Sequence, residues 1–297
     1  MSRIAALSTE LANPRTARLD SMPIEELLRT MNAEDARVTS AVAQAIPQIT
    51  RAVERIVDAR RRGGRLIYIG AGTSGRLGVL DSVECPPTFG IAPGEVLGLI
   101  AGGPDALTRA VEGAEDDPRQ AESDLAAVHL TAADAVVGLA ASGRTPYTLA
   151  ALRYGRTVGA TTIAISCNRN AETSAHADVA IEIETGPEVL TGSTRLKAGT
   201  AQKLVCNMLT TATMVQDGKV YGNLMVDLHP TNAKLVDRAR RIVAEATGVD
   251  LPTATAVLEA AGGHAKTAIV MQLAGVDAVT AGTLLARSNG FVRPAIG

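Results

Sequence analysis

The sequence predicts an α/β fold: a doubly wound parallel sheet of five strands, with helices ahead of it and a small helical module behind it. Five short, almost wholly apolar runs lie at 66–69, 96–101, 135–140, 161–166 and 179–183, and segments able to form helices separate them. Strands that are buried on both faces carry such uninterrupted apolar runs. Strands that alternate with helices indicate a parallel sheet covered on both sides.

Helical segments precede the first strand. Residues 1–20 have little periodicity and indicate an irregular arm, and a first helix is expected near 23–31. Apolar residues recur at spacings of mostly three or four over 33–62, which is the helical period. Pro47 predicts a kink or break within that stretch.

The chain after the fifth strand is mostly helical. A long, largely apolar helix is expected at 197–215, and three short helical patterns follow near 252–260, 265–274 and 278–287. The segment His229-Pro230-Thr231-Asn232 predicts one more helix start, with Thr or Asn as its cap and no chemistry. We therefore expect three parts, which are an N-terminal arm with helices at 1–50, a sheet domain at 51–220 and a C-terminal helical module at 221–297.

Composition excludes several classes of partner. The 297 residues include 29 basic and 31 acidic side chains, a formal charge of −2, so no global basic field attracts nucleic acid or an anionic membrane. With four Tyr, two Phe and no Trp, the chain also lacks the array of rings on which single strands or sugars stack. An anionic ligand must therefore be held by a few groups at one site.

Cysteine usage and apolar patterning indicate a cytoplasmic protein. Cys85, Cys167 and Cys206 are far apart, without a CxxC pair or a histidine at zinc-ligand spacing, so we expect a reducing compartment and no metal site. The sequence shows neither a signal-peptide core nor a run of about 18 apolar residues. We expect a cytoplasmic location and no membrane partner.

Two strands end in loops whose composition suits phosphate. The first strand runs into Gly70-Ala71-Gly72-Thr73-Ser74-Gly75, a G-x-G-x-x-G pattern ahead of a helical stretch, and the third runs into Ser142-Gly143-Arg144-Thr145-Pro146. Backbone amides at a helix N-terminus, together with hydroxyls, suit a compact phosphate monoester. The ends of strands one and three flank the switch point of such a sheet, so both loops can converge on one ligand. The candidate phosphate-binding residues are Gly72, Thr73, Ser74, Gly75, Ser142, Gly143 and Thr145.

A dinucleotide site and plain turn chemistry are the alternatives for these loops. A dinucleotide site needs an acidic residue at the end of the second strand, but that strand ends in Ala101-Gly102-Gly103, and Glu95 lies at its start, at the wrong edge of the sheet. Helix capping and turn formation alone could account for the hydroxyls and glycines of each loop. A third segment, 188–197, adds hydroxyls and two cations.

Two acidic segments are candidates for proton transfer. Glu84 precedes Cys85-Pro86-Pro87, and because a residue before proline is pushed out of the helical region, the helix is expected to end near Glu84. The negative end of the helix dipole and burial beside two prolines would disfavour ionisation and suit a general acid. The run Glu112-Gly113-Ala114-Glu115-Asp116-Asp117 offers four more carboxylates, and spacing alone leaves the choice among them open. Solvent-exposed acids without a role are the alternative, and the four histidines, which are isolated in sequence, are interpreted as structural.

Five segments carry a family resemblance that covers essentially the whole chain. They are STELANPRT at 8–16, GAGTSGRLGVLDSVECPPTFG at 70–90, AGGPDALTRAVEGAEDD at 101–117, TGSTRLKAGTAQKLVCNMLTT at 191–211 and GKVYGNLMVDL at 218–228. Together they resemble sugar isomerase (SIS) domains, and more closely the N-acetylmuramic acid 6-phosphate etherases. The C-terminal module is similar to small ubiquitin-associated-type folds of three helices and is expected to serve packing or dimer contacts.

The resemblance implies a function and a set of site residues. The etherases convert N-acetylmuramic acid 6-phosphate to N-acetylglucosamine 6-phosphate and D-lactate in cell-wall sugar recovery, as dimers and without a metal or redox cofactor. Their mechanism opens the ring, removes the C2 proton, expels lactate from C3 and adds water to the double bond. By motif, Glu84 of ECPPT corresponds to the proton donor, and Glu115, the last Glu of EGAED, to the second glutamate. The resemblance puts the phosphate at the two loops, with Ser193 and Lys197 of the third segment as weaker candidates. Arg76, Arg144 or Arg195 could pair with the lactyl carboxylate.

Two other functions are compatible with the same features. Aldose–ketose isomerisation of a phosphorylated sugar also needs a carboxylate beside an opened ring. A non-catalytic sugar-phosphate sensor would use the same fold, since a fold does not determine a function. The presence of both carboxylates favours an enzyme over a sensor.

Overall fold

The computed structural model describes residues 7–228 and 233–297, and the chain divides into two compact units. The first comprises Met1–Val83 with Gly94–Thr210, and the second Glu84–Pro93 with Thr211–Gly297. The division into three parts that we expect from the sequence stays a prediction.

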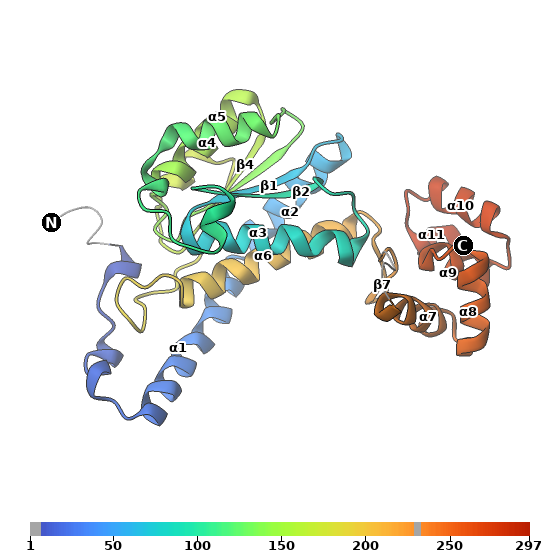
Figure 1. Ribbon diagram of the computed structural model, residues 1–297, viewed down its shortest axis with the longest axis horizontal. Helices are drawn as coiled ribbons and strands as arrows, with labels where there is room; N and C mark the ends of the chain where they lie inside the picture. The colour runs from blue at the N-terminus through green and yellow to red at the C-terminus, as the bar shows by residue number, and fades with distance from the viewer. Residues whose placement is uncertain (1–6, 229–232) are drawn as a thin grey trace. The chain divides into compact units, whose positions relative to one another are not determined.

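The first unit contains the predicted five-stranded parallel sheet, which is thereby confirmed (Figure 1). The strand order is β2-β1-β3-β4-β5, so the chain moves outward in opposite directions from β1 and β3, and the switch point lies between them. Every residue of β1 and β3 is buried, as expected for strands covered on both faces. The strands are β1 (Leu66–Gly70), β2 (Val96–Ile100), β3 (Ala135–Leu139), β4 (Thr161–Ser166) and β5 (Val179–Glu182).

Helices cover both faces of this sheet (Figure 1). On one face lie α4 (Pro118–Ala127) and α5 (Pro146–Val158), and on the other lie α2 (Ile46–Arg61), α3 (Gly72–Phe89) and α6 (Lys197–Gln216). The Tyr147 hydroxyl on α5 donates to Asp124 on α4 at 2.6 Å, which joins the two helices of the first face. The long helix expected at 197–215 is confirmed as α6.

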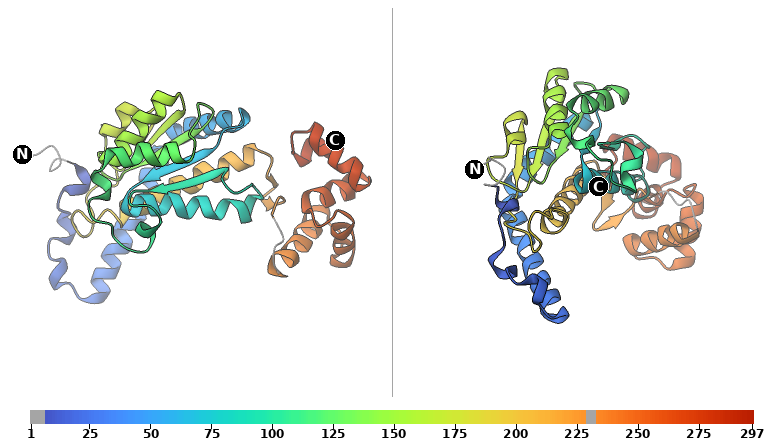
Figure 2. Two further views of the ribbon diagram at one scale, coloured as in Figure 1. Left: turned by 45° about the horizontal axis from the view of Figure 1, so that its top comes forward. Right: turned by 60° about the vertical axis from the view of Figure 1, so that its left-hand side comes forward.

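The N-terminal helices differ from the prediction in their boundaries. The helix expected near 23–31 runs on through α1 (Ile24–Gln44), and the break falls at Ala45. Pro47 lies in the first turn of α2, where its missing N–H would have no intrahelical partner in any case. The first half of α1 extends away from the sheet (Figure 2). Between residue 7 and α1 lie three short 3₁₀ turns, η1 (Ser8–Glu10), η2 (Pro14–Thr16) and η3 (Leu19–Ser21).

The second unit is mostly helical. The three helices predicted for its C-terminal part are confirmed as α8, α9 and α10, whereas the predicted cap at Thr231 or Asn232 lies outside the described residues. Along the described chain no single helix is long and apolar enough to cross a membrane, and α9 with α10 pass that test only as a pair bent by 100°. The elements are β6 (Val220–Tyr221), β7 (Leu224–Met225), α7 (Ala233–Thr247), α8 (Leu251–Ala260), α9 (Ala265–Ala274), α10 (Ala278–Arg287) and α11 (Val292–Ile296).

Candidate functional site

The loop after β1 brings a helix start very close to the end of the strand. A Cβ atom at Gly75 would lie 2.5 Å from the carbonyl oxygen of Gly70 and 2.7 Å from Cγ1 of Ile100. Residue 75 therefore has to be glycine for the first turn of α3 to sit over the end of β1. Since the first N–H groups of a helix have no intrahelical acceptor, this turn presents donors for an anion at the carboxyl edge of the sheet.

The side chains of Thr73 and Ser74 in this loop lie against α6, a neighbour that the sequence did not predict. Ser74 is buried, and its Oγ donates to Oε1 of Gln202 at 2.8 Å. Thr73 is half-buried, and a Cβ atom at Gly199 would lie 3.4 Å from its Cγ2. The early turns of α6 thus form a wall behind the loop. Gln202 lies within the TAQK stretch, but nothing local in that stretch indicates Ser74 as its partner.

The loop after β3 is a tight turn with an available hydroxyl. Gly143 has a φ of +70°, and a Cβ atom there would lie 2.4 Å from Cβ of Ala171, so both its conformation and its surroundings require glycine. The Oγ of Ser142 accepts from the backbone N–H of Arg144 at 3.2 Å. Thr145 precedes α5 without a side-chain capping hydrogen bond and is half-buried, so capping does not explain its hydroxyl.

Sheet pairing places the two loops side by side. Gly70, the last residue of β1, pairs with Leu139, the last residue of β3, and each loop begins directly after its strand. All seven residues predicted from the two loops therefore belong to adjacent segments at the switch point. The backbone N–H donors of the first loop and the hydroxyl of Thr145 in the second are suited to an anionic group there.

The N-terminal arm also contacts this edge, through Asn168 after β4. Asn168 accepts from the Ser8 hydroxyl at 2.9 Å and donates to Oγ1 of Thr9 at 3.0 Å and to the carbonyl of Ala141 at 3.1 Å. One buried amide thus links the arm, β4 and the start of the second loop. Sequence periodicity gave this arm no role.

Lys197 of the third segment lies in an ion pair with the N-terminal helix α1. The Lys197 ammonium donates to Oε2 of Glu34 on α1 at 2.6 Å, and both side chains are only 1% exposed. Arg15 and Arg37 reach the other oxygen of Glu34 at 3.2 and 3.4 Å. Burial by itself raises the pKa of Glu34, but the hydrogen bond and charge of Lys197, with Asn13 and Arg37, outweigh it and hold that pKa below its ordinary value. Lys197 is thus held in a buried ion pair.

The N-terminus of α6 is occupied by a side chain of the protein itself. The carboxylate of Glu188, which is fully buried, accepts from the backbone N–H groups of Lys197 and Ala198, each at 3.0 Å. Burial raises the pKa of Glu188 in spite of these two bonds. Of the third segment, Ser193 lies in the turn before the helix and is half-buried.

The helix carrying Glu84 does not end where the sequence predicts. α3 continues through Pro86 and Pro87 to Phe89, and Gly90 with a φ of +61° follows it. A proline ring holds φ near the helical value, so the helix can continue at the cost of the two missing N–H groups. Glu84 therefore lies inside a helix and is exposed, and the helix end and burial expected for it are not found.

Glu115 lies on a segment that is attached to the first loop. It belongs to the short 3₁₀ turn η5 (Ala114–Asp116) and is exposed, while its neighbour Ala114 packs into the same apolar cluster as Ala71 and Tyr147. Asp117 accepts from the backbone N–H of Arg119 and caps α4. Asp117 thus has a structural role, whereas Glu112, Glu115 and Asp116 are exposed.

The three candidate arginines have different surroundings. The guanidinium of Arg76, in the first turns of α3, donates to the carbonyls of Leu107 and Arg109 at 3.3 and 3.2 Å, and so holds the chain leading to Glu115. Arg144 has a buried Nε without a hydrogen-bond partner among the described residues, and Arg195 is exposed. Within residues 7–228 and 233–297, no three His, Cys, Asp or Glu side chains gather closely enough to hold a metal ion.

Comparison with known proteins shows which families and folds the chain is similar to. Residues 48–156 match the model of the glucokinase regulatory protein N-terminal SIS domain, and residues 119–212 match the SIS domain. The chain is 60% identical over 294 residues to an N-acetylmuramic acid 6-phosphate etherase of Mycolicibacterium smegmatis, covering 99% of each chain. It is 61% identical over 290 residues to the etherase of an Exiguobacterium species, covering 98% of this chain and 99% of the relative.

Solved structures of lower identity share the fold. A phosphoheptose isomerase from Francisella tularensis, 16% identical, superimposes with a TM-score of 0.51 over 66% of this chain and 100% of the isomerase. The corresponding isomerase from Neisseria gonorrhoeae, 15% identical, gives a TM-score of 0.51 over 64% of this chain and 98% of its own. These two likenesses support the sheet architecture.

Proposed function

Because the chain belongs to the N-acetylmuramic acid 6-phosphate etherase family, we propose that it cleaves the lactyl ether of N-acetylmuramic acid 6-phosphate, giving N-acetylglucosamine 6-phosphate and D-lactate. This makes the protein a carbon–oxygen lyase that acts on a phosphorylated amino sugar. The structural observation that carries the proposal is the pair of adjacent loops at the switch point, one that leads into the first turn of α3 and one with a Thr145 hydroxyl that makes no capping hydrogen bond.

The 6-phosphate of the sugar binds to these two loops in this proposal. Gly72, Thr73, Ser74 and Gly75 contribute from the start of α3, and Ser142, Gly143 and Thr145 from the loop before α5. A doubly charged phosphate is favoured there by the positive ends of two helix dipoles. Ser193 stays a candidate ligand, whereas the ammonium of Lys197 is paired with Glu34 and serves to anchor α6.

Glu84 and Glu115 are the proposed acid and base. Opening the sugar ring produces an aldehyde at C1, which acidifies the C2 proton, and Glu115 accepts that proton. The C3–O bond then breaks, and Glu84 donates a proton to the departing lactate oxygen, which would otherwise leave as a poor alkoxide. Water adds across the C2–C3 double bond to complete the product. These steps need no redox cofactor.

Arg144 is the proposed partner of the lactyl carboxylate. It follows Ser142 and Gly143 in the second loop, and its buried Nε has no acceptor among the described residues. A carboxylate would supply one, and a guanidinium fork matches both of its oxygens. Arg76 already donates to two backbone carbonyls. Arg144 is therefore the better candidate of these two.

We further propose that the protein is a homodimer in the cytoplasm and takes part in recovering peptidoglycan sugars. Leu80 and Val83 are 50% and 57% exposed on α3, and with Glu84 they follow the helical spacing that puts them on one face. An exposed apolar surface of this kind is typical of a protein interface. Light scattering coupled to size-exclusion chromatography should give twice the mass of the 30.6 kDa chain.

A lactate-release assay tests the proposed activity. The wild-type protein should release one D-lactate per N-acetylmuramic acid 6-phosphate, and Glu84→Gln and Glu115→Gln should each lower kcat by at least about 100-fold, the usual contribution of a positioned acid or base. Glu112→Gln, an exposed acid of the same segment, serves as the matched control and should keep the wild-type rate. Wild-type rates in Glu84→Gln would exclude its role as the acid.

The same assay separates the alternatives. Formation of a ketose from another sugar phosphate, without lactate release from the muramic acid derivative, would instead indicate an isomerase. Binding without turnover, together with capture of a protein partner, would indicate a sensor.

A further inference from the structure

Gln202 is a buried amide behind the first phosphate loop whose hydrogen-bonding capacity is only partly used. It lies on α6 with no exposed surface, and its Oε1 accepts from the Ser74 hydroxyl at 2.8 Å. Its Nε2 is also buried and has no hydrogen-bond partner in the described part of the chain. Buried polar groups in native proteins are nearly always paired, so an amide N–H without an acceptor needs an explanation.

The present direction of this bond also leaves the Ser74 hydroxyl without a proton for a ligand. A serine hydroxyl has one proton, and here it points to Gln202. A 180° rotation of the carboxamide exchanges Oε1 and Nε2 with little movement of other atoms. Nε2 then donates to Ser74 Oγ, and the hydroxyl proton becomes free to turn toward the anion site.

We propose that Gln202 is a positioning residue for phosphate recognition. In the ligand-bound state its Nε2 donates a hydrogen bond to Ser74 Oγ, and the Ser74 hydroxyl in turn donates a hydrogen bond to an oxygen of the 6-phosphate. This exchange gives Nε2 an acceptor, moves Oε1 to the place that Nε2 now occupies, and converts Ser74 from a hydrogen-bond donor to the protein into a donor to the ligand. An ionised glutamate could not replace Gln202, because it can only accept, and it would place a negative charge behind the phosphate. The inference rests on the proposed function only for the identity of the sugar.

A double-mutant cycle on the full-length protein tests this role. The probes are N-acetylglucosamine 6-phosphate and inorganic phosphate, and titration calorimetry gives their dissociation constants. These constants are compared between the wild type and four variants, Ser74→Ala, Gln202→Met, Gln202→Glu and the double variant Ser74→Ala/Gln202→Met. Ser74→Ala and Gln202→Met should each weaken binding, by roughly tenfold for Ser74→Ala, the lower range for a hydrogen bond to a charged group. Gln202→Glu should weaken it further, and the double variant should bind like Ser74→Ala, since Gln202 acts through Ser74.

Further measurements separate positioning from a structural effect. Gln216→Glu makes the same exchange at an exposed position of α6 and should bind both probes like the wild type. In the lactate assay, Gln202→Met should raise KM by more than it lowers kcat, which loss of packing alone would not produce. Circular dichroism checks that each variant is folded. If Gln202→Glu does not fold, the double-mutant cycle of Ser74→Ala and Gln202→Met still tests the inference.

Two results would overturn the inference. One is wild-type phosphate affinity in Ser74→Ala or Gln202→Met. The other is a double variant whose loss equals the sum of the single losses in free energy. Because inorganic phosphate is one of the probes, a protein that shows the expected coupling but releases no lactate would refute the proposed function and leave this inference standing.

Discussion

Neutralising Glu34 should be among the most destabilising single changes in the sheet unit. The carboxylate and the Lys197 ammonium are each 1% exposed, and 2.6 Å separates Oε2 from Nζ. The change Glu34→Gln keeps the shape of the side chain and removes its charge, so the buried ammonium loses its counter-charge. Water cannot replace that partner at such low exposure.

The loss of unfolding free energy depends on which charged partners remain after each substitution. Breaking a buried pair by removing one member costs about 3–5 kcal/mol, and we expect Glu34→Gln to lie in that range. Lys197→Met should cost less, because Glu34 then keeps Arg15 and Arg37, whose side chains are 60% and 61% exposed. The double variant removes both buried charges and should be more stable than Glu34→Gln alone.

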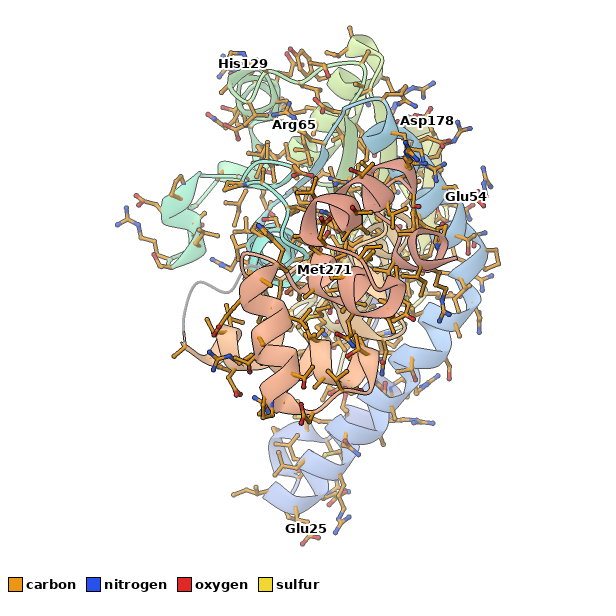
Figure 3. All side chains as sticks on the ribbon, turned by 90° about the vertical axis from the view of Figure 1, so that its right-hand side faces the viewer. Glu25, Glu54, Arg65, His129, Asp178 and Met271 are labelled. Carbon is orange, nitrogen blue, oxygen red and sulfur yellow. The ribbon has the colours of Figure 1, made fainter. Side chains whose placement is uncertain are left out.

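The assay is urea unfolding followed by far-ultraviolet circular dichroism, since the chain has no Trp for fluorescence. Glu25→Gln is the matched control on the same helix. Glu25 pairs with Arg29 at 2.6 Å, both side chains are exposed, and Figure 3 shows Glu25 at the free end of α1. Loss of an exposed pair should cost less than about 1 kcal/mol.

The pH dependence has a definite sign. Because the pKa of Glu34 in the folded protein lies below its ordinary value of 4.5, ionised Glu34 stabilises the fold fully above that pH. This contribution is lost as the pH falls through the lower folded value. The gap in unfolding free energy between wild type and Glu34→Gln should therefore be constant near neutral pH and shrink in acid. A gap no larger than that of Glu25→Gln, or one that grows in acid, would refute this reasoning.

Two further substitutions test the geometry around the first loop. Gly75→Ala places a Cβ atom 2.5 Å from the Gly70 carbonyl oxygen. Urea unfolding should therefore show that the free energy of unfolding falls by about 1–3 kcal/mol, and calorimetry should show a weaker affinity for phosphate. Unchanged values would show that α3 can shift freely. Arg76→Met removes both hydrogen bonds to the chain that leads to Glu115. Because only the chemical step uses Glu115, kcat for lactate release should fall, while the dissociation constant of N-acetylglucosamine 6-phosphate should stay within about twofold of the wild-type value. A loss of product affinity instead would indicate that Arg76 contacts the sugar phosphate.

Much of the sheet and of the phosphate loops could be predicted from sequence because both are encoded locally. The strand at 161–166 has the predicted bounds in the structure, since an apolar run between two helical segments has few other arrangements. Gly75 and Gly143 could be selected because each belongs to a short loop between a buried strand and a helix, and in the structure neither position has room for a Cβ atom. The resemblance to the etherases was also carried by contiguous motifs.

The partners of the site residues could not be predicted, because they are determined by packing between distant segments. Ser74 and Gln202 are 128 positions apart, and Glu34 and Lys197 are 163 apart, so no local pattern links them. The sequence also predicted a helix end at Glu84, since two prolines usually terminate a helix, yet α3 continues to Phe89.

The sequence by itself thus determined the order of strands and helices, the loops at the switch point and the identity of the acidic segments. Only the tertiary structure decided that Lys197 pairs with Glu34, that Glu188 occupies the start of α6 and that Gln202 lies behind Ser74. The physical reason is that periodicity and turn chemistry act within a few residues, whereas a buried polar group takes whichever partner the packed helices and strands bring within about 3 Å.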